Sequence, residues 1–373
     1  MKTTIARLLF PTAVLGVQLC LLSPTVPAET EDRVKKSFAV SAGGQLTVNA
    51  DRGSIEVTAA EGENVEVEVI RKVRVASDAK AKEILEDHEL TFNHEGANVE
   101  ILAKYHGATG RLWRELWNRL QVRFVISVPK KYSVDLKTAG GSITVSDLAG
   151  KVKAETSGGS LKLGRIQGPV NGRTSGGSIS LAAATEAVEV KTSGGRIEVG
   201  EVEATVTAQT SGGSIKIARA KGDAIAKTSG GSITVEEAAA KLEAETSGGS
   251  IHLGKVAGPA TAHTSGGSID IAEISGAINA STSGGSVSAR LTGQPKGDCS
   301  LRSSGGGIRV DLSEKVAVDL DARTSGGRVT TDLPVTITVQ GEQKSNHLQG
   351  KINGGGPALV LKTSGGGIHL RKL

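Results

Sequence analysis

Hydrophobic and polar residues alternate along most of this chain in short runs that return with a fixed period. The tetrapeptide Thr-Ser-Gly-Gly, or a close variant, starts every 18 residues at Thr138, Thr156, Thr174, Thr192, Thr210, Thr228, Thr246, Thr264 and Thr282. It recurs at Ser303, Thr324 and Thr363, with spacings of 21, 21 and 39 residues. In the last gap, Asn353-Gly354-Gly355-Gly356 stands where a missing motif is expected. A constant period of this length is typical of stacked structural repeats, and the motifs predict twelve coils.

When each repeat is numbered from its threonine, the side chains sort by phase. Positions six and eight are apolar in all nine of the 18-residue repeats, as in Ile197 and Val199, and position seven between them is mostly polar or charged. Positions fifteen and seventeen are a second apolar pair, as in Val188 and Val190. Alternation with period two is typical of a strand that buries one face. Each repeat is therefore predicted to form strand, turn, strand, turn.

Glycines occupy the positions where each coil is expected to turn. A glycine pair follows every Thr-Ser, and position thirteen is often glycine as well, as in Gly150 and Gly168. Glycine suits tight corners and lets neighbouring backbones approach closely. Apolar residues of the same phase then lie over one another about 4.8 Å apart. The predicted fold class is all-β, a parallel β-solenoid, with the right-handed coiling that such crossovers nearly always take.

The threonine at position one allows two interpretations. It continues the inward alternation of positions fifteen and seventeen, which predicts an internal ladder of hydroxyls that bond the corner backbone. Alternatively, the stacked Thr and Ser hydroxyls form an outward array about 4.8 Å apart that binds ice or glycan.

The regular pattern is interrupted near the N-terminus. Residues 29–64 are predicted to form the first coil or coils, because four apolar residues match the inward phases: Leu46, Val48, Ile55 and Val57. Residues 65–121 are predicted to form a small elaboration that caps the stack, with one or two short helices and a hairpin. Ser77 begins one helix, and the hairpin turns near Gly96. Regular coiling is expected over residues 122–373.

Both tryptophans lie in this elaboration, on one apolar stripe at helical spacing. The stripe consists of Leu112, Trp113, Leu116, Trp117 and Leu120. One interpretation is a cap that covers unpaired strand edges at the end of the stack. The other is an interaction helix that contacts a partner or a membrane surface. Its candidate contact residues are Trp113, Trp117, Arg111, Arg114 and Arg119.

Residues 1–28 have the features of a secretory signal peptide. Lys2 and Arg7 flank the start of an apolar stretch that ends near Leu22, and Ala28 closes a small-residue cleavage sequence. We therefore predict export to the periplasm, the cell surface or the medium. Cleavage leaves Cys299 as the remaining cysteine, and its inward phase predicts a buried thiol.

Composition and charge exclude some classes of fold and function. Aromatic residues make up 2% of the chain and glycine occurs 50 times, which suits a thin repetitive β structure and excludes a thick globular core. The formal charge of +5 falls to +3 without Lys2 and Arg7, and it is spread evenly. Nucleic-acid binding is therefore not predicted.

No cluster of catalytic or metal-binding residues emerges from the repeats. A polysaccharide lyase or hydrolase needs two or three carboxylates that converge on one patch, whereas position eighteen alternates in sign, as in Glu155 and Arg173. His252 and His263 share one repeat but have no carboxylate or thiol at ligand spacing. We predict a protein without enzymatic activity, metal or cofactor. The alternative is a carbohydrate-binding or polysaccharide-degrading β-helix protein.

As a set, these motifs resemble the bacterial toastrack family, an adhesin-like β-solenoid with Ser-Gly-Gly strand repeats. The resemblance covers essentially the whole mature chain and is carried by Gly43 to Val48, Ser127-Val128-Pro129, the Thr-Ser-Gly-Gly coils, Ile352 to Pro357 and Thr363 to Ile368. It implies a parallel β-solenoid on an exported protein and supplies no catalytic or ligand residues. The predicted function is an adhesin-like or envelope scaffold whose partner is an envelope protein or glycan.

Overall fold

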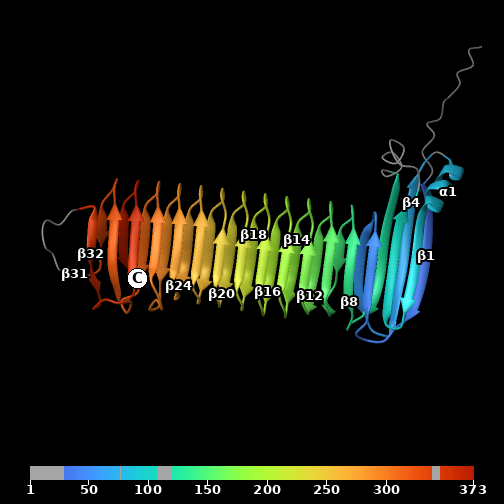
Figure 1. The fold of residues 1–373 in the computed structure, drawn as a ribbon, viewed down its shortest axis with the longest axis horizontal. Coiled ribbons are helices and arrows are strands. Elements are labelled where there is room, and N and C mark those ends of the chain that lie inside the picture. Colours follow the sequence, from blue (N-terminus) through green and yellow to red (C-terminus); the bar gives the residue numbers. More distant parts are fainter. Residues whose placement is uncertain (1–28, 76, 107–118, 338–344) are drawn as a thin grey trace, which may run out of the picture.

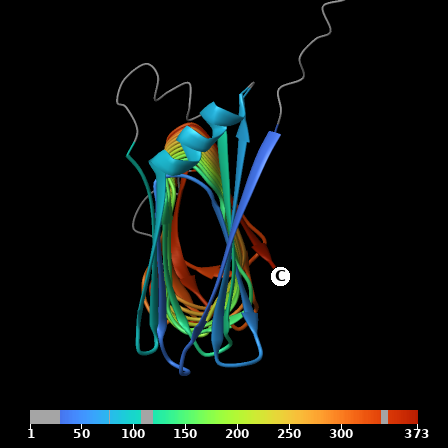
Figure 2. The ribbon, with the colours of Figure 1, turned by 90° about the vertical axis from the view of Figure 1, so that its right-hand side faces the viewer.

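The protein is a long rod of stacked β-coils (Figure 1). The computed structural model describes residues 29–75, 77–106, 119–337 and 345–373. Two long sheets face each other across a narrow interior, as the view along the rod shows (Figure 2). The all-β parallel solenoid predicted from the repeats is confirmed, and the described residues contain one helix, α1 (Asp78–Asp87). That helix is too short to cross a membrane.

Sheet A forms one wall of the rod. From the N-terminal end of the rod, its strands pair in the order β1 (Glu29–Ala39), β4 (Asn64–Arg74), β7 (Leu120–Pro129), β3 (Ser54–Ala60), β9 (Ile143–Val145), β12 (Leu161–Gln167), β14 (Ile179–Ala184), β16 (Ile197–Val202), β18 (Ile215–Ala220), β20 (Ile233–Ala238), β22 (Ile251–Val256), β24 (Ile269–Ile274), β26 (Val287–Leu291), β28 (Ile308–Leu312), β34 (Ile368–Lys372) and β30 (Val329–Thr331). The short β10 (Leu148–Ala149) also pairs with β12.

Sheet B forms the opposite wall. Its strands pair in the order β5 (His88–Glu95), β6 (Asn98–Tyr105), β2 (Gln45–Ala50), β8 (Ser133–Thr138), β11 (Val152–Thr156), β13 (Val170–Arg173), β15 (Val188–Lys191), β17 (Val206–Gln209), β19 (Ala224–Lys227), β21 (Leu242–Glu245), β23 (Ala260–Thr264), β25 (Ile278–Thr282), β27 (Cys299–Ser303), β33 (Ala358–Thr363), β29 (Val318–Thr324), β32 (His347–Ile352) and β31 (Val335–Thr336).

Aliphatic side chains of equal phase stack from coil to coil through the middle of the rod. Ile197 pairs with Ile215, and Ile215 pairs with Ile233, in parallel register. All three are at most 1% exposed. The outward residues between them, such as Glu198 and Lys216, are exposed. The predicted continuous interior is therefore confirmed, and it leaves the intervening polar side chains on the outer walls.

The second glycine of each motif is required by close approach of two backbones. A Cβ atom placed on Gly177 would lie 2.0 Å from the carbonyl oxygen of Gly159 in the preceding coil, a distance that no real Cβ contact shows. A Cβ atom on Gly176, the first glycine, would lie 3.7 Å from its nearest atom, which is ordinary contact. The repeat spacing thus depends on the second glycine more than on the first.

At the N-terminal end of the rod, antiparallel strands cover the first coil. That coil, formed by β2 and β3, lies inside β6 and β7. Outside it, β4 runs antiparallel to β7, β1 runs antiparallel to β4, and β5 and β6 form the predicted hairpin. Helix α1 packs against β4 and β5 through Ala81 and Ile84. Ser77 precedes the helix as predicted, but its side chain makes no capping hydrogen bond.

The C-terminal end departs from the order that the sequence predicts. The last coil in the sequence, β33 and β34, is not last in the stack: it is inserted between the coil of β27 and β28 and the coil of β29 and β30. Strand β32 then runs antiparallel to β29 and helps close the rod. Repeat phase predicts which face of a strand is buried, but it does not predict which coil supplies the neighbouring strand in the stack.

The segment expected to replace a missing Thr-Ser-Gly-Gly corner has a different role. Asn353, Gly354 and Gly355 have positive φ angles of 51°, 88° and 90°. These left-handed conformations, which favour glycine and asparagine, connect antiparallel β32 to the inserted β33. The segment is therefore a reversing turn.

Candidate interaction surfaces

The threonine ladder at position one is internal. In one coil, the Thr156 hydroxyl donates to the carbonyl oxygen of Gly141 at 2.8 Å and accepts from the N–H of Gly159 at 3.3 Å. The same pair of bonds recurs along the stack, and the residues at this position are at most 7% exposed. The prediction of an internal hydroxyl ladder is confirmed, so the threonines are not an outward ice- or glycan-binding array.

The outer walls carry mixed charges that pair between neighbouring strands. Lys227, for example, lies 2.5 Å from Glu243 and 3.0 Å from Glu245 on the next strand of sheet B. On sheet A, Arg219 lies 2.9 Å from Glu237. Exposed pairs of this kind contribute little to stability, roughly 0–1 kcal/mol each. They compensate part of the charge on both outer walls.

His252 has a carboxylate neighbour that spacing within one repeat does not reveal. Its Nδ1 lies 3.0 Å from a carboxylate oxygen of Asp270, which occupies the same phase in the next coil. His263 instead bonds the hydroxyl of Ser281 at 2.8 Å. Comparing equal phases in consecutive coils would have found both contacts. Within the described parts of the chain, no three His, Cys, Asp or Glu side chains are grouped so as to hold a metal ion.

A shallow groove follows one corner of the solenoid, which we call the corner groove. One side is formed by position-eighteen side chains from Lys191 to Arg323, and the other by the serines that follow the buried threonines. It comprises two adjoining hollows of about 480 and 700 Å³ that share His263. Because its side chains sit on consecutive strands, they present polar groups at the strand spacing of about 4.8 Å.

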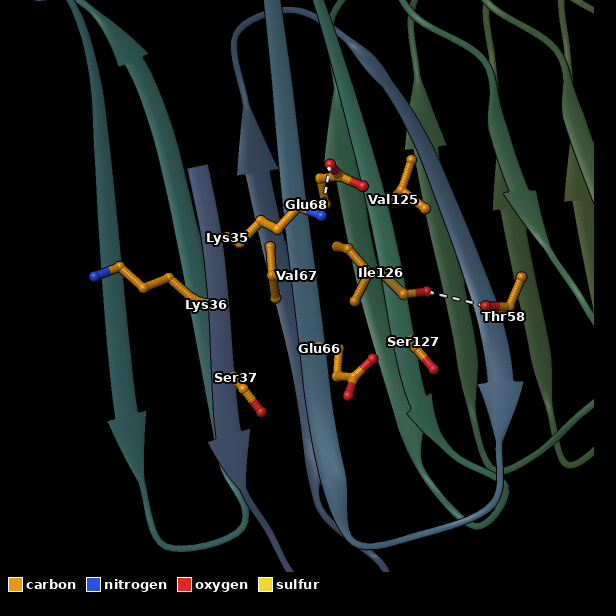
Figure 3. Close-up of a pocket in the computed structure, with 10 residues that line it drawn as sticks. All are labelled: Lys35, Lys36, Ser37, Thr58, Glu66, Val67, Glu68, Val125, Ile126 and Ser127. Carbon is orange, nitrogen blue, oxygen red and sulfur yellow. Dashed lines mark hydrogen bonds and ion pairs between the residues drawn. The ribbon is translucent and has the colours of Figure 1, made fainter. Parts of the chain in front are cut away.

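A second hollow of about 470 Å³ lies on the outer face of sheet A near the N-terminus (Figure 3). It crosses β1, β4, β7 and β3, and its charges are mixed. Lys35 pairs with Glu68 at 3.4 Å, and the Thr58 hydroxyl donates to the carbonyl oxygen of Ile126 at 3.4 Å. Lys35 in this hollow is therefore already paired with a carboxylate.

Most of the predicted interaction segment lies outside the described residues. This applies to Trp113, Trp117, Arg111 and Arg114. Arg119 is described: it is exposed directly before β7, and its carbonyl oxygen accepts a hydrogen bond of 3.0 Å from the N–H of Arg74. Both interpretations of the segment, as a cap or as an interface, stay predictions.

Two buried titratable side chains belong to the interior. Cys299 is 1% exposed, and burial raises the pKa of its thiol, which confirms the prediction of a buried cysteine. His88 is 2% exposed, and neither of its ring nitrogens has a hydrogen-bond partner among the described residues. Burial, followed by the nearby Arg71, lowers the pKa of His88 to about 4. The imidazole is therefore neutral at neutral pH.

The stacked parallel coils and their polar walls place this chain in the class of parallel β-solenoid proteins. More particularly, the chain belongs to the Toastrack DUF4097 family, whose model matches residues 44–265. No curated protein matches it. The family assignment rests on that match, which spans more than half of the chain.

Several solved structures are similar to this chain at low sequence identity. A candidate cell adhesion protein from Clostridium sporogenes is 14% identical, and the match has a TM-score of 0.18. The matched region covers 92% of this chain and 100% of that protein's chain. A candidate adhesin from Bacteroides fragilis is 9% identical, with coverages of 92% and 97% and a TM-score of 0.22. A candidate lipid-binding protein from Parabacteroides distasonis is 12% identical, with coverages of 92% and 97% and a TM-score of 0.25.

Proposed function

We propose that this protein is an exported, adhesin-like scaffold without enzymatic activity, which presents its solenoid walls to an envelope protein or glycan. The observation that carries the proposal is the corner groove, a continuous strip of exposed side chains on a backbone fixed by stacked coils. The inward side chains are committed to packing, and the corner threonines to backbone bonds. A rigid surface of this kind binds without a large loss of conformational entropy.

The arrangement of charged groups on the walls supports binding in preference to catalysis. Glycoside cleavage uses two carboxyl groups held on either side of one bond. Along the corner groove, Glu245 instead pairs with Lys227, and on the flanking wall Glu189 pairs with Lys191 at 2.8 Å. A carboxylate engaged by a cation is stabilised in its ionised form and is a poor general acid.

Export is supported by the signal-peptide features of residues 1–28. When the full chain is expressed in a bacterial host and the cells are fractionated, we expect a mature protein that begins near Glu29 outside the cytoplasm. A full-length product that stays in the cytoplasm would contradict export.

A binding protein is distinguished from an enzyme by incubating the purified protein with envelope fragments and with a panel of polysaccharides. We expect sedimentation with the envelope fragments and no release of unsaturated or reducing-end products. Release of such products would overturn the proposal in favour of a polysaccharide-degrading enzyme. Absence of envelope binding would overturn the scaffold assignment.

A further inference from the structure

The inserted C-terminal coil assembles a row of cations that are distant in the sequence. Arg302 of β27 pairs in register with Lys362 of β33, and Lys362 pairs in register with Arg323 of β29. All three side chains are exposed. Since neighbouring strands lie about 4.8 Å apart, the three strands carry these charges across about 10 Å. Without the insertion of β33, Lys362 would not lie between the two arginines.

Two of the three cations in this row have no carboxylate partner among the described residues. Arg302 bonds the Ser300 hydroxyl at 3.1 Å, and neither it nor Lys362 forms an ion pair with any of the described residues. Arg323 lies 2.7 Å from Asp321, which also contacts His347 at 3.2 Å. Of the three permanent cations, Arg323 alone therefore pairs with a carboxylate among the described residues.

A matched pair of cations elsewhere in the ladder shows the contrast. Arg173 and Lys191 are also neighbours at position eighteen, on β13 and β15. Both contact Glu189, at 3.1 and 2.8 Å. Like charges that face each other across strands destabilise a sheet unless they are compensated. The C-terminal row keeps this repulsion, which an external anion would relieve.

The groove around the row is lined by hydrogen-bond donors. The three cations form one side of its C-terminal hollow of about 700 Å³. The exposed hydroxyls of Ser304, Ser364 and Ser325 lie opposite, one per coil. None of the described residues that line this hollow is an aspartate or glutamate. Guanidinium, ammonium and hydroxyl groups together suit carboxylate or sulfate oxygens.

We propose that the C-terminal part of the corner groove binds a linear polysaccharide that carries repeated carboxylate or sulfate groups. This inference rests on the proposed function and names the class of glycan that the scaffold recognises. The polymer lies along the stack, where its anionic groups meet successive cations and its sugar hydroxyls meet the serines. The described lining of the hollow has no Phe, Tyr or Trp side chain, the large rings on which nucleic-acid bases usually stack.

The test measures binding of the purified protein to polygalacturonate, heparin and neutral dextran at low ionic strength. We expect binding to polygalacturonate, heparin or both, which separates carboxylate from sulfate recognition, and none to dextran. Replacing two of the three cations, Arg302→Gln with Lys362→Gln, is expected to weaken binding about tenfold or more. The control Arg219→Gln with Lys221→Gln removes two exposed cations outside the corner groove, and it is expected to change binding less than about twofold, because Glu237 and Glu203 already pair with these side chains.

Two further measurements distinguish loss of folding from loss of positive charge as the cause of weaker binding. The Arg302→Gln, Lys362→Gln variant should melt no lower than the wild type, because it relieves repulsion between exposed neighbours. Lys362→Arg, which keeps the charge, should retain binding.

The proposal is overturned if neither polyanion binds or if dextran binds equally well. It is also overturned if the two double variants bind alike or if Lys362→Arg loses binding. Envelope binding that survives Arg302→Gln with Lys362→Gln would overturn this site while leaving the scaffold function intact. Loss of envelope binding by the wild type would instead contradict the scaffold function itself.

Discussion

At the scale of single residues, each Thr-Ser-Gly-Gly corner of the solenoid combines a hydroxyl that bonds the backbone with a glycine that lets the next backbone approach. The Thr228 hydroxyl donates to the carbonyl oxygen of Gly213 at 2.8 Å and accepts from the N–H of Gly231 at 3.3 Å. Because this corner is closed to water on its inner side, the hydroxyl replaces the solvent that these groups would otherwise need.

Replacing Thr228 by valine tests this role, because valine keeps the shape of threonine and removes the hydroxyl. We expect the free energy of unfolding to fall by about 1–3 kcal/mol, since two buried backbone groups lose their partner. Ser229→Ala, at the neighbouring exposed position, is the control and should be close to neutral. Chemical denaturation of both variants measures the difference. Equal stability of the two would show that the hydroxyl does not matter.

His88 predicts a pH dependence of stability. Its pKa of about 4 in the folded protein lies below the ordinary histidine value of 6.5, so the unfolded chain binds a proton between these values while the folded protein does not. The stabilisation linked to neutral His88 is therefore fully present above pH 6.5. As the pH falls towards 4, the free energy of unfolding decreases by roughly 3 kcal/mol in total. His88→Leu should lose less stability than the wild type over this range.

The matched control for His88 is His263→Gln, which changes an exposed histidine. Melting temperatures measured between pH 7 and pH 4.5 provide the comparison. We expect the control to follow the wild type and His88→Leu to depart from both. If all three proteins lose stability in parallel, burial of the neutral imidazole is not the cause of the acid sensitivity.

At the scale of elements, the spacing between coils depends on the second glycine of each motif. Gly177→Ala places a Cβ atom 2.0 Å from the carbonyl oxygen of Gly159, so the two coils must separate locally. We expect a loss of more than about 2 kcal/mol, within the range of severe packing defects. Gly176→Ala, with its nearest atom at 3.7 Å, should be nearly neutral. A comparable loss in both variants would contradict the close-approach argument.

The strands and corners could be predicted from the sequence because a period-two pattern repeats with constant phase. The position of the last coil could not. Leu359 and Leu361 of β33 have the same inward phase as any other coil, and phase does not identify the neighbouring strand. The adjacency of Lys362 to Arg302 and Arg323 therefore became visible only in three dimensions. The contact between His252 and Asp270, in contrast, follows from equal phase in consecutive coils.

At the scale of the whole molecule, the rod closes differently at its two ends but by related means. Near the N-terminus, β4 runs antiparallel beside the returning strand β7 and covers the first coil. Near the C-terminus, antiparallel β32 lies outside β29, and the final coil is inserted inside it. Antiparallel outer strands interrupt the parallel stack, which limits end-to-end addition of further coils.

The insertion of β33 between β27 and β29 is the claim on which the proposed polyanion site depends, and engineered disulfides test it most directly. In a Cys299→Ala background, Ser300→Cys with Val360→Cys places cysteines on paired positions of neighbouring strands. Ser300→Cys with Asp321→Cys places them two strands apart, about 10 Å, which is too far for a disulfide. We predict rapid cross-linking of the first pair under mild oxidation and none of the second. Cross-linking of the second pair instead of the first would show that the coils stack in sequence order and would contradict the account.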